Sequence, residues 1–205
     1  MAQRFKTILL FGAPGAGKGT QGELIGQVPG FFHMSTGDMF RSLDHESEAG
    51  KKFRAYSEKG ELVPDEVTIK LWQCYMDKSI EEGRFDPNSM ILILDGLPRT
   101  VAQAKLIEPL IDVLAVVHLN ASDREAMVTR LRERALKQNR TDDAKEEVVR
   151  NRLDIYERDT RPVLNTYDPS VIHEIDALDT MAMVMMHVLQ VVAPIHAGHL
   201  LSAKA

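Results

Sequence analysis

The stretch that decides the fold is Lys6-Thr-Ile-Leu-Leu-Phe11, followed by Gly12-Ala-Pro-Gly-Ala-Gly-Lys-Gly-Thr20. Its first part is mostly apolar rather than alternating, which is typical of a strand covered on both faces of a parallel sheet. Its second part fits the pattern G-x-x-x-x-G-K-[ST], with one glycine inserted before the hydroxyl residue. A helix is predicted to follow over residues 17–27. A glycine-rich loop between a strand and a helix is a setting that binds phosphate.

Each part of this loop has a physical purpose. The glycines let the backbone curl, so that several N–H groups point at one anion. The start of the helix adds partial positive charge, and Lys18 adds a full charge that can follow a phosphoryl group during transfer. The chain lacks the N-K-x-D signature of guanine recognition, which argues against a GTPase. The residues of the loop predicted to bind ATP are Gly12, Gly15, Ala16, Gly17, Lys18, Gly19 and Thr20.

Apolar runs and helical patterns alternate along the rest of the chain. Short apolar or extended runs at His33–Ser35, Met90–Leu94, Val113–Leu119 and Val171–Ile175 are predicted strands. The alternation predicts a doubly wound α/β fold with a parallel sheet of about five strands and helices on both faces. We expect one domain over residues 1–205. Two polar stretches, about 36–64 and about 132–143, interrupt the pattern and are candidates for mobile elements mounted on the core.

Some local patterns allow more specific predictions. Val67, Leu71, Cys74 and Tyr75 fall on one face of a helix, and we expect Cys74 to be a buried structural thiol. Ser122, with a glutamate three residues later, predicts a capping box at the start of another helix. His118, inside an apolar strand, and His33 are expected to be structural. Residues 181–192 are expected to form an amphipathic core helix rather than a membrane span.

Composition narrows the class of protein. The chain has 205 residues, of which 44% are hydrophobic, and a formal net charge of −5. The charge gives no sign of nucleic-acid binding. A single cysteine permits no intrachain disulfide and no cysteine-rich zinc site, so a reducing cytoplasm is the expected compartment. The apolar run near the N-terminus is too short for a signal peptide. We therefore expect a cytoplasmic protein without membrane or nucleic-acid partners.

Four blocks of sequence, taken together, resemble the adenylate kinases over nearly the whole chain. They are GAPGAGKGT at Gly12–Thr20, STGDMFR at Ser35–Arg41, LVPDEV at Leu62–Val67 and LDGLPRTVAQA at Leu94–Ala104. A looser fifth block runs from Arg130 to Leu153. The resemblance implies a phosphate-loop core with a helical monophosphate-binding insertion at about 36–64 and a short lid at about 132–143. It also implies Mg²⁺-dependent, reversible phosphoryl transfer from ATP to AMP by a monomer, giving two ADP.

The resemblance also implies roles for single residues. Arg41 and Arg99 would hold the AMP phosphate, Arg130 would stack on the adenine of ATP, and Arg134, Arg140 and Arg152 would converge on the transferred group. The predicted catalytic residues are Lys18, Arg99, Arg134, Arg140 and Arg152. Predicted ATP contacts outside the loop are Arg130 and Arg134. The predicted AMP contacts are Thr36, Arg41, Leu62, Val63, Gly96, Arg99, Gln103, Arg140 and Arg152.

The chemistry fits these roles. A phosphate acceptor is already an ionised nucleophile, so no general base is needed, and the task is to neutralise charge between two polyanions. Arginine suits this because its planar group grips phosphate oxygens in pairs. Asp95 ends an apolar strand at the edge of the sheet where ligands bind in such folds. Together with Thr20 it is placed to hold Mg²⁺ through water. The alternative is that Asp95 caps the next turn. The segment 134–140 is too short for a zinc-bearing hairpin, so no zinc is expected.

Three other readings compete with an AMP kinase. A UMP/CMP kinase of the same fold typically has alanine in place of Thr36 and asparagines after the G-x-P-R block, whereas Gln103 here suits adenine. A kinase for a hydroxylated metabolite would need a base near its acceptor. A nucleotide-sensing module without catalysis would tolerate loss of the lid arginines.

One extra residue within 144–147, relative to the family, is expected in the loop before the next helix.

Overall fold

The computed structural model of the chain describes residues 4–44, 46–138 and 145–202. Five strands form one sheet in the order β2-β3-β1-β4-β5, and every neighbouring pair is parallel. The predicted fold class is therefore confirmed. The strands are Phe5–Gly12 (β1), Phe31–Ser35 (β2), Ile91–Asp95 (β3), Ile111–Asn120 (β4) and Ile172–Asp176 (β5).

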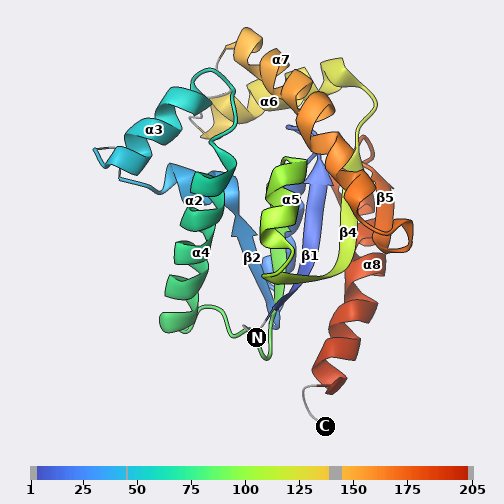
Figure 1. Cartoon of the computed structure of the whole chain (residues 1–205). Coiled ribbons are helices and arrows are strands. Elements are labelled where there is room, and N and C mark those ends of the chain that lie inside the picture. The colour runs from blue at the N-terminus through green and yellow to red at the C-terminus, as the bar shows by residue number, and fades with distance from the viewer. Residues whose placement is uncertain (1–3, 45, 139–144, 203–205) are drawn as a thin grey trace.

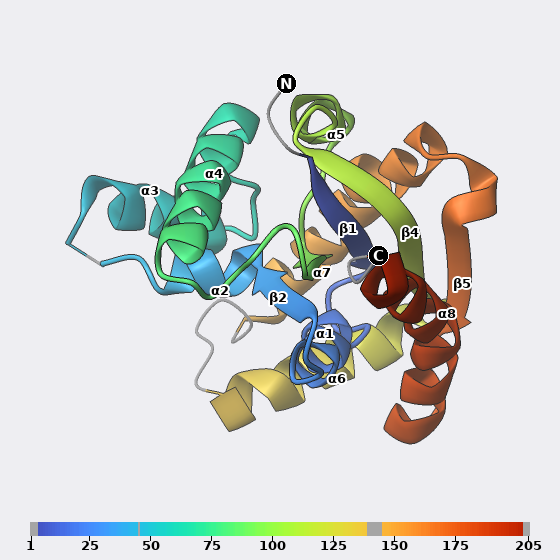
Figure 2. The ribbon, with the colours of Figure 1, turned by 90° about the horizontal axis from the view of Figure 1, so that it is seen from below.

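Helices cover both faces of the sheet (Figures 1 and 2). They are Lys18–Gly26 (α1), Thr36–Arg41 (α2), Glu48–Ser57 (α3), Asp65–Glu81 (α4), Val101–Ile107 (α5), Arg124–Gln138 (α6), Glu146–Ile155 (α7) and Met181–Ser202 (α8). A π-helical turn, Tyr156–Thr160 (η2), continues α7, and two 3-10 turns, Arg161–Thr166 (η3) and Pro169–Val171 (η4), lead to β5. α2 and α3 lie within the stretch 36–64 that interrupted the sequence pattern.

The two faces of β1 contribute side chains to two hydrophobic clusters. Ile8 and Leu10 join a cluster with residues of α1, α6, α7 and α8, and Leu9 and Phe11 join a cluster with residues of α4, α5 and η3. Alternate residues of a strand point to opposite faces, so a central strand must be apolar on both. This is why the run from Ile8 to Phe11 lacks the alternation of a half-exposed strand.

The burial predicted for α4 was wrong. Its buried residues are Thr68, Ile69, Trp72, Met76 and Ser79, whereas Cys74 is exposed. Trp72 is fully buried. The face with the largest apolar side chains removes the most surface from water, so it turns inward and rotates the smaller thiol to the outside.

The capping box predicted at Ser122 was also wrong. α6 begins one residue later than that box requires, and the Asp123 carboxylate accepts a 3.0 Å hydrogen bond from the Ala126 N–H. An Asp at the N-cap stabilises a helix as well as Ser does and adds charge that favours the helix dipole. Glu125 is thereby released from the expected cap and contacts α7 instead.

The last helix packs on β4 and β5 through a stripe of valines. Val184, Val188 and Val192 are buried at four-residue spacing, while Met186 and Leu189 are exposed. The expected packing against the core is present, but the outer face is apolar rather than polar. By length and composition alone, Met181–Leu200 meets the criteria for a membrane-spanning helix, a test that core helices of soluble proteins also pass.

Candidate active site

A cleft of about 500 Å³ opens beside the carboxyl ends of the central strands. β2 and β3 lie on one side of β1, and β4 and β5 lie on the other. The connection from β1 to β2 therefore runs to one side of β1, and the connection from β3 to β4 runs to the other. Such a reversal leaves a crevice at the carboxyl ends of the strands, where ligands bind in such folds. α6 and α7 lie beyond these ends (Figure 1).

The predicted site residues meet in this cleft, apart from Arg140, which lies outside the described residues. Those that line it are Gly12, Gly15, Ala16, Gly17, Lys18, Gly19, Thr20, Thr36, Arg41, Leu62, Val63, Asp95, Gly96, Arg99, Gln103, Arg130, Arg134 and Arg152. Asp38, Tyr156 and Thr160 line it too, although no sequence pattern points to them as site residues.

The glycine-rich loop has the backbone that its composition predicts. Gly17 is the N-cap of α1 at φ 96°, a left-handed conformation that favours glycine. Gly12 approaches β4 so closely that a side-chain carbon built on it would lie 2.6 Å from the Leu119 carbonyl oxygen. The Nζ of Lys18 donates to the Gly12 carbonyl at 2.6 Å and to the Ala13 carbonyl at 3.1 Å. The lysine thus folds back over the loop that a phosphate would occupy.

The electrostatics of Lys18 mark the cleft as an anion site. Burial lowers the pKa of Lys18 to about 8, and the Asp95 carboxylate opposes this shift. The nearby guanidinium groups of Arg99, Arg134 and Arg152 lower the Lys18 pKa further. Like charges gathered at a buried point disfavour each other until an anion neutralises them.

The carboxyl end of β3 offers oxygen ligands for a cation. Asp95 is the last residue of that strand and is 7% exposed. Its Oδ2 would lie 3.8 Å from a side-chain carbon built on Gly19, so the carboxylate faces the loop. Thr20 also lines the cleft. Mg²⁺ prefers oxygen ligands and is commonly held by one or two carboxylates together with water and substrate phosphates, so these residues fit it.

No cluster of three or more His, Cys, Asp or Glu side chains able to hold a metal occurs among the described residues. Mg²⁺ commonly draws several of its ligands from water and substrate phosphates, so it does not need such a cluster.

Contacts to the backbone hold the residues predicted to bind the acceptor. The Arg99 Nε donates to the Gly96 carbonyl at 2.7 Å, and the Arg99 N–H donates to the Gln103 Oε1 at 2.7 Å. The hydroxyl of Thr36 donates to the Gly96 carbonyl at 2.9 Å. The Gln103 oxygen thus supports the loop of Arg99, which leaves its NH₂ group as the part able to face a base. Arg41 forms a 2.6 Å ion pair with Asp38 on α2.

α6 and α7 carry the arginines of the lid side. Arg130 and Arg134 lie on α6 and Arg152 lies on α7. The Arg130 NH1 donates to the Ala177 carbonyl at 2.6 Å, which directs this arginine toward the segment after β5. α7 begins at Glu146 with Lys145 as N-cap. Residues 146 and 147 of the window 144–147 lie within this helix, so the place of the extra residue before the helix stays a prediction.

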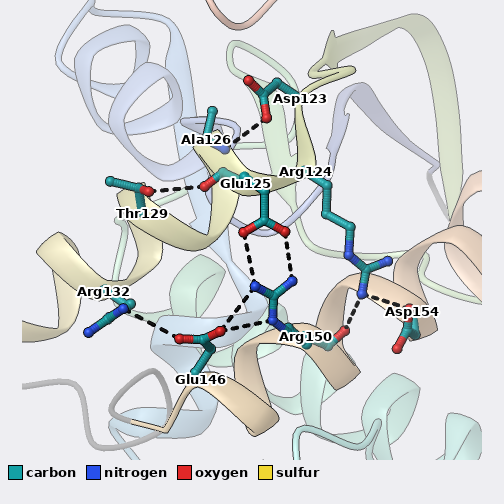
Figure 3. A network of polar contacts seen from close by, with 9 residues as sticks. All are labelled: Asp123, Arg124, Glu125, Ala126, Thr129, Arg132, Glu146, Arg150 and Asp154. Atoms are coloured by element: carbon teal, nitrogen blue, oxygen red, sulfur yellow. Dashed lines mark hydrogen bonds and ion pairs between the residues drawn. The ribbon is translucent and has the colours of Figure 1, made fainter.

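An exposed ion-pair network joins α6 to α7 (Figure 3). Arg150 binds both carboxylate oxygens of Glu125, at 2.7 and 2.9 Å, and also binds Glu146 at 3.0 Å. Arg124 pairs with Asp154 at 2.8 Å. Only the pair of Glu146 with Arg150 has the four-residue spacing that sequence could show. The contacts between helices depend on how α6 and α7 cross.

Comparison with known proteins agrees with this geometry. A family model described as "Adenylate kinase" matches residues 10–172. An adenylate kinase of Flavobacterium psychrophilum is 37% identical over 192 residues, which cover 90% of this chain and 97% of that protein. One of Kocuria rhizophila is 38% identical over 180 residues, covering 85% and 92%. One of Cyanothece sp. is 40% identical over 167 residues, covering 78% and 80%. Because the family model spans most of the chain and these relatives align over most of their length, the chain belongs to the adenylate kinase family of phosphotransferases.

Proposed function

We propose that the protein transfers the terminal phosphoryl group of ATP to AMP, giving two ADP, and that the reaction is reversible. An oxygen of the AMP phosphate forms a bond to the γ-phosphorus, and the bond from that phosphorus to the β–γ bridging oxygen breaks. The observation that carries the proposal is the convergence of Lys18, Arg99, Arg134 and Arg152 on one cleft.

The roles of the residues follow from charge and position. The curled loop and Lys18 hold the phosphates of ATP, and Arg41 and Arg99 hold the phosphate of AMP. Arg134, Arg140 and Arg152 neutralise the charge that develops on the transferred group. Arg130 contacts the adenine of ATP. Bound Mg²⁺, held through water near Asp95 and Thr20, would supply further neutralisation of the polyphosphate.

We further propose that the two stretches at about 36–64 and about 132–143 move during the reaction. α2 and α3, within about 36–64, would form the monophosphate-binding insertion, with Leu62 and Val63 beside the AMP base. The segment of about 132–143 would be a short lid. We propose a monomer of 23.0 kDa that works in the cytoplasm, and sedimentation equilibrium tests that mass.

AMP is preferred to a pyrimidine acceptor because Gln103 is buried at the acceptor end of the cleft with its NH₂ group available to a base. A coupled assay of ADP formation with AMP, CMP or UMP tests this. We expect the highest kcat/KM with AMP. UMP or CMP as the better acceptor would move the protein to the pyrimidine branch, and no turnover with any acceptor would make it a sensing module.

Two substitutions separate recognition of the base from support of Arg99. Gln103→Ala removes both the donor and the oxygen that holds the Arg99 N–H, so it should erode the AMP preference and also raise KM. Gln103→Glu keeps an oxygen for Arg99 but replaces the NH₂ group. We expect it to lower kcat/KM for AMP at least about 10-fold, since a buried polar edge left unpaired is costly. Retention of the full AMP preference in Gln103→Glu would contradict the role.

A further inference from the structure

Three side chains form a hydrogen-bonded chain that the proposed reaction does not use. The Nδ1 of His118 lies 2.7 Å from the Glu174 Oε1, and the Nε2 lies 2.9 Å from the Tyr156 hydroxyl. A carboxylate only accepts, so Nδ1 donates to Glu174, and in the neutral imidazole Nε2 accepts from Tyr156. His118 and Tyr156 are buried, whereas the Glu174 side chain is 55% exposed. The chain thus runs from the edge strand β5 through β4 to the end of α7.

The sheet sets the level of this chain in the molecule. His118 is the register partner of Phe11 on β1 and of Glu174 on β5. Phe11 directly precedes Gly12, where the glycine-rich loop starts. The Tyr156 hydroxyl is therefore tied to the sheet at the level where the loop leaves it.

Tyr156 follows Arg152 by four residues across the end of α7. Side chains at this spacing lie on the same face of a helix, about 6 Å apart along its axis. Arg152 lines the cleft and is near enough to Lys18 to lower its pKa. A small rotation of the C-terminal end of α7, which we call its inner end, would therefore move Arg152 away from the phosphates.

The π-helical turn that begins at Tyr156 is held at its other end as well. The Thr160 hydroxyl donates to the Arg99 carbonyl at 2.9 Å. Single π-helical turns are rare and occur frequently at functional sites. An exposed network also holds α7 to α6, through Arg150 with Glu125 and Asp154 with Arg124 (Figure 3). Exposed pairs are screened by solvent, whereas the buried contact of Tyr156 is directional.

We propose that Tyr156, His118 and Glu174 are positioning residues, which hold the inner end of α7 against β4 so that Arg152 is directed at the phosphoryl group near Lys18. The inference rests on the proposed function, because it assigns these residues to that reaction. It predicts that the contribution of the Tyr156 hydroxyl to turnover passes through Arg152.

The test is a double-mutant cycle. Tyr156→Phe removes only the hydroxyl, and we expect kcat to fall about 5- to 10-fold, the worth of one hydrogen bond, with KM for ATP within about twofold. In an Arg152→Ala background the same change should have almost no effect on kcat. Glu174→Gln keeps an oxygen that accepts from His118, so it should retain most of the activity. Tyr167→Phe is the control, because Tyr167 is a half-buried tyrosine, packed on Phe11, and the described cleft lining does not include it.

Two results would overturn the inference. One is a Tyr156→Phe variant with wild-type kcat. The other is an equal loss of kcat with and without Arg152, which indicates a structural role alone. A second measurement separates the positioning role from the proposed reaction. It repeats the double-mutant cycle with the affinity for a two-headed adenosine pentaphosphate in place of kcat. Coupling between Tyr156 and Arg152 in binding, without ADP formation by the unmodified protein, would contradict the proposed reaction and support the positioning role.

Discussion

At the scale of single residues, the cleft concentrates positive charge in a chain whose net charge is −5. Lys18 is central, because the ammonium of this half-buried side chain contacts the loop carbonyls while three arginines lie near enough to lower its pKa. A bound polyphosphate would replace those carbonyls and neutralise the cluster. The global charge of a protein thus says little about the ligand of one cleft.

Replacing Lys18 tests its role directly. Lys18→Met removes the charge at nearly constant length, and we expect kcat to fall about 100-fold or more, with a smaller change in ATP affinity. The lysine acts as a cation, and its pKa of about 8 in the free protein means that the protonated fraction falls as pH rises through 8. The pH profile of kcat/KM for ATP, which reports the free enzyme, should therefore decline above that pH.

Lys18→Arg is the control for this prediction. Its guanidinium stays protonated at every accessible pH, so the decline above pH 8 should disappear even if the rate is lower. A wild-type profile that stays flat well above pH 8, or a Lys18→Met variant with near-normal kcat, would contradict the phosphate-loop role.

At the scale of elements, the start of α7 decides which residues face the cleft. One residue added within a helix rotates everything on one side of it by about 100°. α7 starts at Glu146, and the prediction is that the extra residue lies before it, which would preserve the helical register of Arg152. Arg140 lies outside the described residues, so its predicted position in the closed cleft stays a prediction.

Paired truncations examine that register. Arg140→Ala and Arg152→Ala should each lower kcat about 100- to 1,000-fold, as loss of one transition-state donor does. Binding of AMP alone, measured by calorimetry, should change less at Arg140 than at Arg41, since lid contacts form mainly on closure. Lys137 also lines the cleft. If Arg140→Ala leaves kcat unchanged while Arg152→Ala lowers it, the role of Arg140 would fall to Lys137. Lys137→Ala should then lower kcat instead.

At the scale of the whole molecule, the fold is held by two hydrophobic clusters on opposite faces of one sheet. Cys74, the single cysteine of the chain, is a free thiol, so no intrachain disulfide joins the clusters. We expect metal to matter to turnover and not to folding.

Metal removal separates these two effects. We expect EDTA to abolish ADP formation and added Mg²⁺ to restore it, with the melting temperature of the nucleotide-free protein unchanged. Elemental analysis of the purified protein should find no stoichiometric zinc. A melting temperature that falls with EDTA, or one zinc per chain, would show a structural metal site and contradict the prediction of a short, metal-free lid.

The sequence by itself determined the fold class and the phosphate loop, and its motifs indicated the arginines of the cleft through their resemblance to a family. These features are local: an unalternating strand, a run of glycines and short motifs each specify their own backbone or charge within a few residues. The parallel sheet then brings the ends of its strands to one edge, so motifs far apart in sequence meet without further information.

Only the tertiary structure decided which face of α4 is buried, which residue caps α6, and how His118 is satisfied. Each depends on competition among neighbours that are distant in sequence. The larger Trp72 is buried in preference to Cys74. His118 contacts Tyr156 and Glu174 only because β4 lies between β5 and the end of α7. Hydrogen bonds of this kind have no sequence period. They are set by packing, and packing exists only once the chain has folded.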